Sequence, residues 1–385
     1  MFALALLVGC REHDLMRCHF GEEQILAETG GGHFHAVRHL GDSLLWSARE
    51  GLFVREGDAE PERLGPPCDA GLDAIADGGA TFVVCARRAE PDAAKEGGLV
   101  AWRLGEERLE RALPGAVGEE SDGVALARHG NRLVVAWHEG APKAFHVWRQ
   151  DLDPETLEPS DEPERLSNPR FAAGAPTLYS DDEHLAVAWG EHWADHEGRH
   201  RVSGHVVVSV DGSHARMLVE VEDTHPAPVI ARDAEGLLLL FRDQRAPLDY
   251  PSIFGHRLTS DFRLHGRLRL VGRADEGGPI RTFGCDIDGA RTQIAVVARS
   301  WGADDTLVAA HLLDDELAER FHELQVYEWG GQLVLGDGVC DDNSLELLVA
   351  ERVVPASDDA RRRTAHLVTL PARCGAGPYP RSGAH

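Results

Sequence analysis

The sequence lacks a hydrophobic segment long enough to cross a membrane as a helix, which needs about 18 or more apolar residues. Phe2–Val8 is apolar throughout but has only seven residues. No other stretch approaches 18 apolar residues. The GxSxG, P-loop and GxGxxG signatures are also missing, so three familiar kinds of catalytic or nucleotide site have no support. Low-complexity tracts and Pro- or Gly-rich linkers are absent as well, and we therefore expect one large domain.

Basic residues are scarce relative to acidic ones. The chain has 39 Lys and Arg against 65 Asp and Glu, which gives a formal net charge of −26. Such a surface repels phosphate backbones, so we expect no nucleic-acid partner. The one basic cluster, Arg361–Arg363, follows Asp358 and Asp359 and is most simply a local counter-charge in a hairpin loop.

The sequence does contain one short apolar segment that recurs seven times. The copies are Leu44–Ala48, Phe82–Ala86, Leu133–Trp137, Leu185–Trp189, Leu237–Phe241, Ile294–Ala298 and Leu347–Glu351. Taking Ala48, Ala86, Ala136, Ala188, Leu240, Ala298 and Ala350 as equivalent, the steps are 38, 50, 52, 52, 58 and 52 residues. A period of roughly 40–50 residues built from short strands indicates a propeller or another repeat array.

Each copy belongs to the same four-strand pattern. A strand precedes it, a tight polar turn joins the two, and two more alternating strands follow, as in the stretch from Gly123 to Trp137. This pattern predicts an all-β fold, a seven-bladed β-propeller. A pair of β-sandwiches would need a linker, and a solenoid would show a shorter period. The helix-like spacing within Leu313–Leu324 leaves open whether blade six ends in a short surface helix or a strand.

The last blade provides only three strands, whereas Gln24–Glu28 forms an extra strand before the first blade. We expect this N-terminal strand to pair antiparallel with Thr364–Leu370 and to complete the last blade. That arrangement removes two open sheet edges and joins the two ends of the chain.

The repeats resemble those of exported bacterial β-propeller proteins, in which strands of the type hVVAW follow a Gly, Asn or Asp turn. The resemblance extends from about Gly32 to Leu370 and concerns architecture, which does not carry function with it. The Trp-Asp dipeptide of WD40 blades is absent, and so is the Ser-x-Asp-x-Gly-x-x-Trp box of sialidases.

The segment Leu7-Val8-Gly9-Cys10 resembles the lipobox of bacterial lipoproteins, in which the cysteine becomes the lipid-bearing first residue. The resemblance implies lipidation of Cys10 and a location on the bacterial cell envelope, with the lipid as the membrane anchor. The expected domains are a signal peptide at 1–9, a lipidated tether at 10–21, the propeller at 22–374 and an irregular tail at 375–385. The alternative is an apolar N-terminal strand with a buried cysteine.

The cysteine count agrees with export. Seven cysteines are present, and acylation of Cys10 leaves six, which can pair completely in an oxidising compartment. The predicted closure brings the two terminal cysteines within disulfide reach, and two further cysteines lie on inner strands of adjacent blades. We therefore predict three disulfides: Cys18–Cys374, Cys285–Cys340 and Cys68–Cys85.

The first candidate site is the mouth of the central channel, where propeller ligands usually bind. The candidate ligand-binding residues, all placed near the start of innermost strands, are His33, His35, Asp73, Asp122, His225 and Arg281. Imidazole and carboxylate groups facing one cavity can bind a divalent metal or hydrogen-bond to a sugar or peptide. The alternative is that polar residues line the channel of any propeller without a specific role.

The second candidate site is the loop Glu191–His200. His192, Asp195, His196 and His200 are spaced so that they can converge on one metal ion, Ca²⁺ or Zn²⁺, and Trp193 can instead stack on a sugar or peptide. With 21 histidines in the chain, clusters also arise by chance.

These observations favour a monomeric, non-enzymatic binding module that presents loops to a protein or glycan ligand of the cell envelope. The alternative is an exported polysaccharide hydrolase or lyase with its site at the channel mouth. A glycosidase needs two carboxylates roughly 5–10 Å apart, and Asp73 with Asp122 is the one pair that the pattern suggests.

Overall fold

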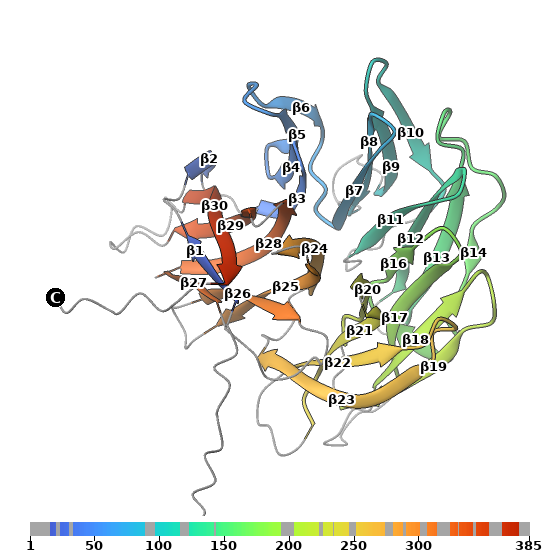
Figure 1. The fold of residues 1–385 in the computed structure, drawn as a ribbon. Coiled ribbons are helices and arrows are strands. Elements are labelled where there is room, and N and C mark those ends of the chain that lie inside the picture. Colours follow the sequence, from blue (N-terminus) through green and yellow to red (C-terminus); the bar gives the residue numbers. More distant parts are fainter. Residues whose placement is uncertain are drawn as a thin grey trace, which may run out of the picture.

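The computed structural model describes residues 16–20, 24–30, 34–88, 97–115, 123–141, 144–193, 204–222, 226–233, 235–245, 252–273, 280–287, 290–300, 306–313, 324–329, 331–341, 344–353 and 364–376. Within these residues the named elements are all β-strands, and they form seven antiparallel sheets around a common centre (Figure 1). The chain is therefore an all-β protein with the architecture of a β-propeller.

Sheets 1 to 3 follow one another along the chain. Sheet 1 contains β3 (Phe34–Leu40), β4 (Ser43–Ala48), β5 (Gly51–Glu56) and β6 (Glu62–Gly65). Sheet 2 contains β7 (Gly71–Asp77), β8 (Ala80–Arg87), β9 (Gly98–Leu104) and β10 (Leu109–Leu113). Sheet 3 contains β11 (Val124–His129), β12 (Arg132–Ala141), β13 (Ala144–Leu152) and β14 (Glu164–Arg165).

Sheets 4 to 6 repeat the pattern. Sheet 4 contains β15 (Phe171–Ala173) and β16 (Thr177–Ser180), which both pair with β17 (Leu185–Trp193), then β18 (Gly204–Val210) and β19 (Arg216–Val221). Sheet 5 contains β20 (Val229–Asp233), β21 (Gly236–Asp243), β22 (Ser252–Leu258) and β23 (Leu264–Arg273). Sheet 6 contains β24 (Arg281–Ile287), β25 (Ala290–Ser300), β26 (Thr306–Leu313) and β27 (Leu324–Trp329).

Sheet 7 joins the two ends of the chain. It contains β28 (Gly331–Asp341), β29 (Ser344–Val353) and β30 (Thr364–Ala376), and the N-terminal strands β1 (Met16–Phe20) and β2 (Gln24–Gly30) both pair with β30. The predicted closure is confirmed, because β2 runs antiparallel to β30 from Gln24 opposite Thr369 to Gly30 opposite Thr364.

The N-terminal segment reaches further along sheet 7 than the sequence predicts. β1 continues the pairing of β2 along β30, with Met16 opposite Ala376 and Phe20 opposite Ala372. β1 lies within the expected tether at 10–21 and β30 extends into the expected irregular tail from 375, and the domain bounds themselves stay predictions. The physical reason for the longer pairing is the length of β30, whose second half leaves backbone N–H and C=O groups that a neighbouring strand satisfies.

The seven recurring apolar segments fall on the second strand of each sheet, as predicted. This strand has a partner on each edge, and where the side chains of its apolar segment are described they are almost all buried. In β21, Leu238 to Phe241 are fully buried, and in β12, Leu133 to Trp137 are nearly so. Burial of Val, Leu, Phe and Trp side chains stabilises a fold by about 1.5–3 kcal/mol each, which makes these strands the main source of stability.

The first strands of the sheets lie nearest the centre (Figure 1). They contact one another in the order β3, β7, β11, β16, β20, β24 and β28, and β28 in turn contacts β3. The open question about blade six is settled in part, since β27 is a fourth strand of sheet 6, while residues 314–323 lie outside the described part of the chain.

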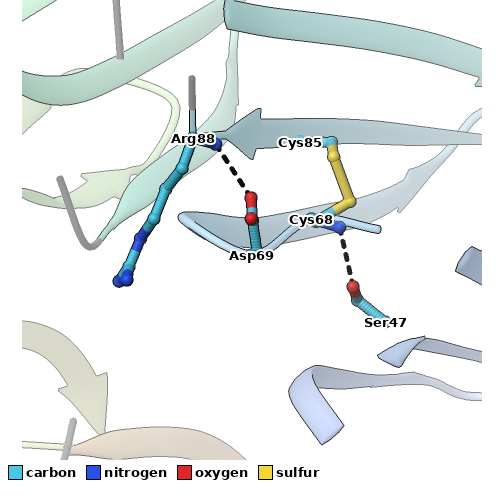
Figure 2. The surroundings of a disulfide bond; sticks show 5 residues. All are labelled: Ser47, Cys68, Asp69, Cys85 and Arg88. Atoms are coloured by element: carbon cyan, nitrogen blue, oxygen red, sulfur yellow. Dashed lines mark hydrogen bonds between the residues drawn. A yellow bond between two sulfur atoms is a disulfide. The ribbon is translucent and has the colours of Figure 1, made fainter. Parts of the chain in front are cut away.

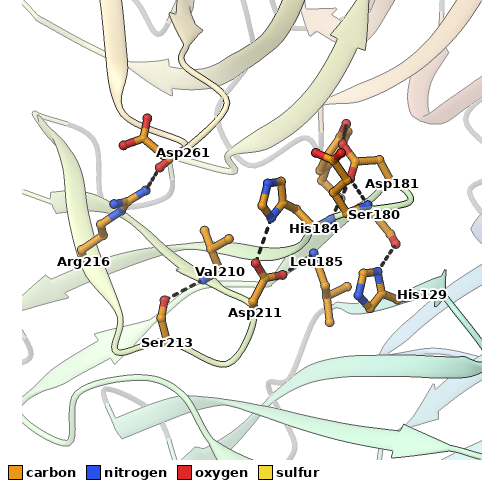
Figure 3. Close-up of polar contacts among 12 residues, drawn as sticks. His129, Ser180, Asp181, His184, Leu185, Val210, Asp211, Ser213, Arg216 and Asp261 are labelled. Atoms are coloured by element: carbon orange, nitrogen blue, oxygen red, sulfur yellow. Dashed lines mark hydrogen bonds and ion pairs between the residues drawn. The ribbon is translucent and has the colours of Figure 1, made fainter.

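Polar contacts between neighbouring sheets repeat along the chain. The Arg128 Nε lies 3.7 Å from Asp77 Oδ2, His129 Nδ1 lies 3.1 Å from Ser180 Oγ, and the Arg232 Nη1 donates to Asp181 Oδ2 at 3.0 Å. Figure 3 shows the contact of His129 with Ser180. Each contact joins residues 51 positions apart, close to the steps of 50 and 52 residues between the apolar segments of these sheets. Sheets 2 and 3, 3 and 4, and 4 and 5 are therefore each joined by a polar side-chain contact.

The predicted disulfide Cys68–Cys85 is confirmed. Cys68 lies between β6 and β7, Cys85 lies on β8, and both are fully buried (Figure 2). Cys68 N also donates to Ser47 Oγ at 2.7 Å, so this connection is fixed to sheet 1 as well as sheet 2.

The other two cysteine pairs stay predictions. Cys18 lies directly opposite Cys374 in the register of β1 and β30. Facing residues in an antiparallel pair have Cα atoms about 4.5–5.5 Å apart, within disulfide range. Cys340 on β28 is disulfide-bonded, and its expected partner Cys285 lies on the neighbouring strand β24.

Candidate functional site

Four charged residues lie on four consecutive innermost strands. They are Arg281 on β24, Asp337 on β28, Arg38 on β3 and Asp73 on β7, and these strands contact one another in that order. Charges are rare within short buried strands, since an unpaired charge is costly to bury. Arginine and aspartate therefore alternate around one half of the ring, and we call them the central quartet.

Asp73 connects three sheets. Its Oδ1 accepts a hydrogen bond from Arg38 Nε at 2.7 Å, and its Oδ2 accepts one from Leu126 N of β11 at 2.8 Å. The side chains of Arg38 and Asp73 are 6% and 19% exposed, so water screens this ion pair only weakly. Both carboxylate oxygens of Asp73 are thus engaged by the framework.

Asp337 on sheet 7 connects that sheet to sheet 1. Its Oδ2 accepts a hydrogen bond from His39 N at 3.0 Å, and its Oδ1 accepts one from Gly338 N at 2.9 Å. Both carboxylate oxygens are again engaged, here by backbone donors alone. The two aspartates therefore hold neighbouring sheets together at the centre of the ring.

The two arginines of the quartet differ from the aspartates. The Arg38 Nη1 donates to the carbonyl oxygen of Val37 at 2.7 Å, whereas its buried Nη2 has no hydrogen-bond partner within the described residues. Arg281 makes no side-chain hydrogen bond in that same part of the chain. Burial and the nearby Arg38 charge lower the pKa of Arg281 to about 10, while Asp73 and Asp337 act in the opposite direction. Arg281 remains a cation at neutral pH, and the Arg38 Nη2 is the quartet donor without a partner within the described residues.

The structure places some of the predicted ligand-binding residues and not others. Asp73 and Arg281 belong to the central quartet, and His35 lies half-buried at the irregular pairing near the start of β3. His33, Asp122 and His225 lie outside the described residues. Whether the six residues bind a ligand therefore stays a prediction.

Most of the predicted metal site also lies outside the described residues. His192 is on β17, but Asp195, His196 and His200 fall in a segment that the structure does not describe. Within the described ranges, three or more His, Cys, Asp or Glu residues nowhere gather in a metal-binding arrangement. The segment 196–200 reads His-Glu-Gly-Arg-His and matches the HExxH zinc pattern, although that pattern needs a helix to bring its histidines together.

Two members of the quartet, Arg38 and Asp337, were not predicted from the sequence. A signal existed for both. Arg38 interrupts the apolar run of β3, and Asp337 stands between two glycines at a strand position where the other sheets mostly carry uncharged residues. Neither feature indicates which residue Arg38 or Asp337 contacts, because the contacting residues belong to different sheets.

A second polar cluster lies on sheet 4, at the turn between β16 and β17 and the turn between β18 and β19. Figure 3 shows the imidazole of His184, whose Nδ1 lies 2.9 Å from Asp211 Oδ2. The hydrogen bond to Asp211 raises the pKa of His184. Burial and the hydrogen bond to Asp181 raise the pKa of Tyr179 to about 12, so this phenol stays neutral. Every partner in this cluster belongs to the fold, which indicates a structural role.

The described residues include no helix long and apolar enough to cross a membrane.

Comparisons with known proteins identify the fold. The sequence matches no protein-family model and no curated protein. Among solved structures, the chain is similar to a puromycin-hydrolyzing peptidase of Mycobacterium tuberculosis, with 18% identity, a TM-score of 0.50 and 86% of this chain aligned to 53% of that one.

Two other structures show a weaker likeness. A sialidase of Trypanosoma rangeli in complex with sialic acid has 11% identity and a TM-score of 0.48, over 87% of this chain and 59% of that one. The AfRom2 CNH domain has 10% identity and a TM-score of 0.49, over 91% of this chain and 99% of that one. The chain spans little more than half the length of the sialidase and the peptidase. The likeness to the peptidase, at a TM-score of 0.50 and 18% identity, concerns the fold and establishes nothing about activity.

Proposed function

We propose that the protein is a seven-bladed propeller that acts as a non-enzymatic binding module on the bacterial cell envelope, anchored by a lipid on Cys10. Its ligand is a protein or glycan of the envelope, bound at the centre of the ring. The closed order of contacts among the seven innermost strands supports the blade count. The N-terminal sequence supports the anchor.

One observation carries the choice of binding over catalysis. All four carboxylate oxygens of Asp73 and Asp337 already accept framework hydrogen bonds. These contacts hold the two aspartates in place between neighbouring sheets, which favours a structural role for them over that of a general acid or nucleophile. The donor of the quartet that lacks a partner within the described residues is the Arg38 Nη2, and a guanidinium donor suits recognition of a ligand.

The alternative, a polysaccharide hydrolase or lyase, relies on Asp73 together with Asp122. Asp122 lies outside the described residues, and Asp73 is held between Arg38 and Leu126 N. Asp73 therefore already has a structural role, which makes this alternative the weaker one.

The test incubates the full lipidated chain with purified envelope polysaccharides and envelope proteins. We expect stoichiometric retention of one component, measured by sedimentation with the membrane fraction, with no new reducing ends or unsaturated sugars. Catalytic release of either product by the purified protein would contradict the proposal. Heat-denatured protein is the control for contaminating activity.

A further inference from the structure

We propose that Arg38 and Arg281 together bind a carboxylate group of the ligand at the centre of the ring. This inference rests on the proposed binding function and names the chemistry that the site recognises. It concerns the two arginines of the quartet, of which Arg38 has a buried donor without a partner within the described residues.

The first argument is the state of Arg38. Its side chain is only 6% exposed, and two of its three nitrogens have partners, Asp73 for Nε and the Val37 carbonyl for Nη1. The remaining Nη2 is buried without an acceptor within the described residues. Buried donors are nearly always paired, so this nitrogen has room in its coordination for an acceptor such as a ligand, an ion or a water. An acceptor at Nη2 would give all three nitrogens of the Arg38 guanidinium group a hydrogen-bond partner.

The second argument is the position of Arg281. Its strand β24 contacts β28, which in turn contacts β3. Arg281 is close enough to Arg38 for the two charges to repel, and it also interacts with Asp73 and Asp337 across the same space. Two guanidinium groups that repel each other hold an anion between them more favourably than either does alone. The aspartates cannot take this place, because their oxygens are engaged.

The third argument decides the class of anion. A carboxylate is planar, carries one charge and matches the fork of an arginine with two parallel hydrogen bonds. A phosphate monoester carries close to two charges at neutral pH, and Asp73, Asp337 and the net charge of −26 all oppose it. The quartet therefore favours a carboxylate, from a uronic acid of a glycan or an acidic residue of a protein.

The experiment measures binding to the full chain by isothermal titration at constant ionic strength. The glycan probe is trigalacturonate, with its methyl ester as the uncharged match. The protein probe is N-acetyl-glutamate amide, with N-acetyl-glutamine amide as the match. Inorganic phosphate is the third probe. We expect one of the two carboxylates to bind at least tenfold more tightly than its match, and phosphate to bind more weakly.

Variants assign the binding to the site. We expect Arg281→Gln to weaken carboxylate binding at least tenfold and Arg281→Lys, which keeps the charge but loses the fork, to weaken it less. Arg267→Gln removes one positive charge from an exposed position on the outer strand β23 and should leave binding unchanged. The melting temperature of each variant is measured alongside, and Arg281→Lys serves as the test if Arg281→Gln does not fold.

Two results would overturn the carboxylate site. Equal binding of each acid and its uncharged match would show that no carboxylate is recognised, and equal binding by the wild type and Arg281→Gln would place recognition elsewhere. Either result leaves the proposed function intact if the protein still retains an uncharged envelope component. If it retains none, the proposed function fails as well.

Discussion

Asp73 forms an ion pair with a buried arginine between two sheets. Its carboxylate faces the buried Arg38 guanidinium and the backbone N–H of Leu126. Removing one partner of a buried ion pair leaves an uncompensated charge, and the remaining partner then destabilises the folded state. Asparagine at this position keeps an oxygen for Leu126 N and removes the charge, so the substitution isolates the ion pair.

We expect Asp73→Asn to lower the free energy of unfolding by about 3 kcal/mol, measured by urea denaturation. The matched control is Asp77→Asn on the same strand, whose carboxylate is 44% exposed and 3.7 Å from Arg128. Surface pairs of this kind contribute about 0–1 kcal/mol. Equal losses for the two variants would contradict a buried ion pair at Asp73.

His184 provides a prediction on pH. Its folded pKa is raised, chiefly by the hydrogen bond to Asp211, so the stabilisation is fully present below the unfolded pKa of the imidazole, about 6.5. It is lost as the pH rises through the folded pKa. The pair is partly exposed, which limits the effect to less than about 1 kcal/mol at moderate salt.

We therefore expect His184→Gln to destabilise the protein more at pH 5.5 than at pH 9, as measured by thermal unfolding in matched buffers. His214→Gln, which removes an exposed histidine from the turn after β18, should show the same small effect at both values. A larger loss for His184→Gln at pH 9 would reverse the sign and contradict the charged pair.

At the scale of elements, the closing segment of β1 and β2 has the clearest role. These strands cover the outer edge of β30 along nearly its whole length, from Thr364 to Ala376. An uncovered edge presents unpaired N–H and C=O groups and promotes association with other chains. Closure of sheet 7 therefore contributes both stability and solubility.

Truncation tests this role. A chain that begins at residue 31 loses both strands, and we expect a lower melting temperature and aggregation on concentration, followed by light scattering. A chain that begins at residue 16 keeps both strands and should melt like the full-length protein. Equal behaviour of the two truncated chains would contradict the contribution of β1 and β2.

The sequence predicts the elements of this fold better than its central site. The apolar segments mark the second strand of each sheet because that strand is buried on both faces, and the turn residues mark the hairpins next to it. The pairing of β2 with β30 follows from a missing strand at one end and an extra one at the other. These are properties of local pattern and of strand number.

The quartet could not be predicted in the same way. Arg38 and Asp73 are 35 residues apart, and His39 and Asp337 are 298 apart, so neither contact has a local signature. β1 was missed for a related reason: Met16–Phe20 has no strong alternation, and its partner is the far end of a 13-residue strand. Such contacts depend on how sheets are placed around the ring.

At the scale of the whole molecule, the predicted lipid anchor determines where the protein acts. Expressed in a bacterium, the full chain should incorporate labelled palmitate and sediment with membranes, and Cys10→Ser should do neither. The reason is that the acylated cysteine supplies the membrane affinity in this account. Equal labelling of the two forms would contradict lipidation of Cys10.

Closure of the ring between sheets 7 and 1 is what brings β24, β28, β3 and β7 together, and with them the central quartet. Cysteines report on it because Cys18 on β1 lies opposite Cys374 on β30. The most direct measurement is peptide mapping of the intact protein under non-reducing conditions. A ring closed by the N-terminal strands predicts a peptide that links Cys18 to Cys374, whereas Cys18 linked to any other cysteine would contradict the closure and the site built on it.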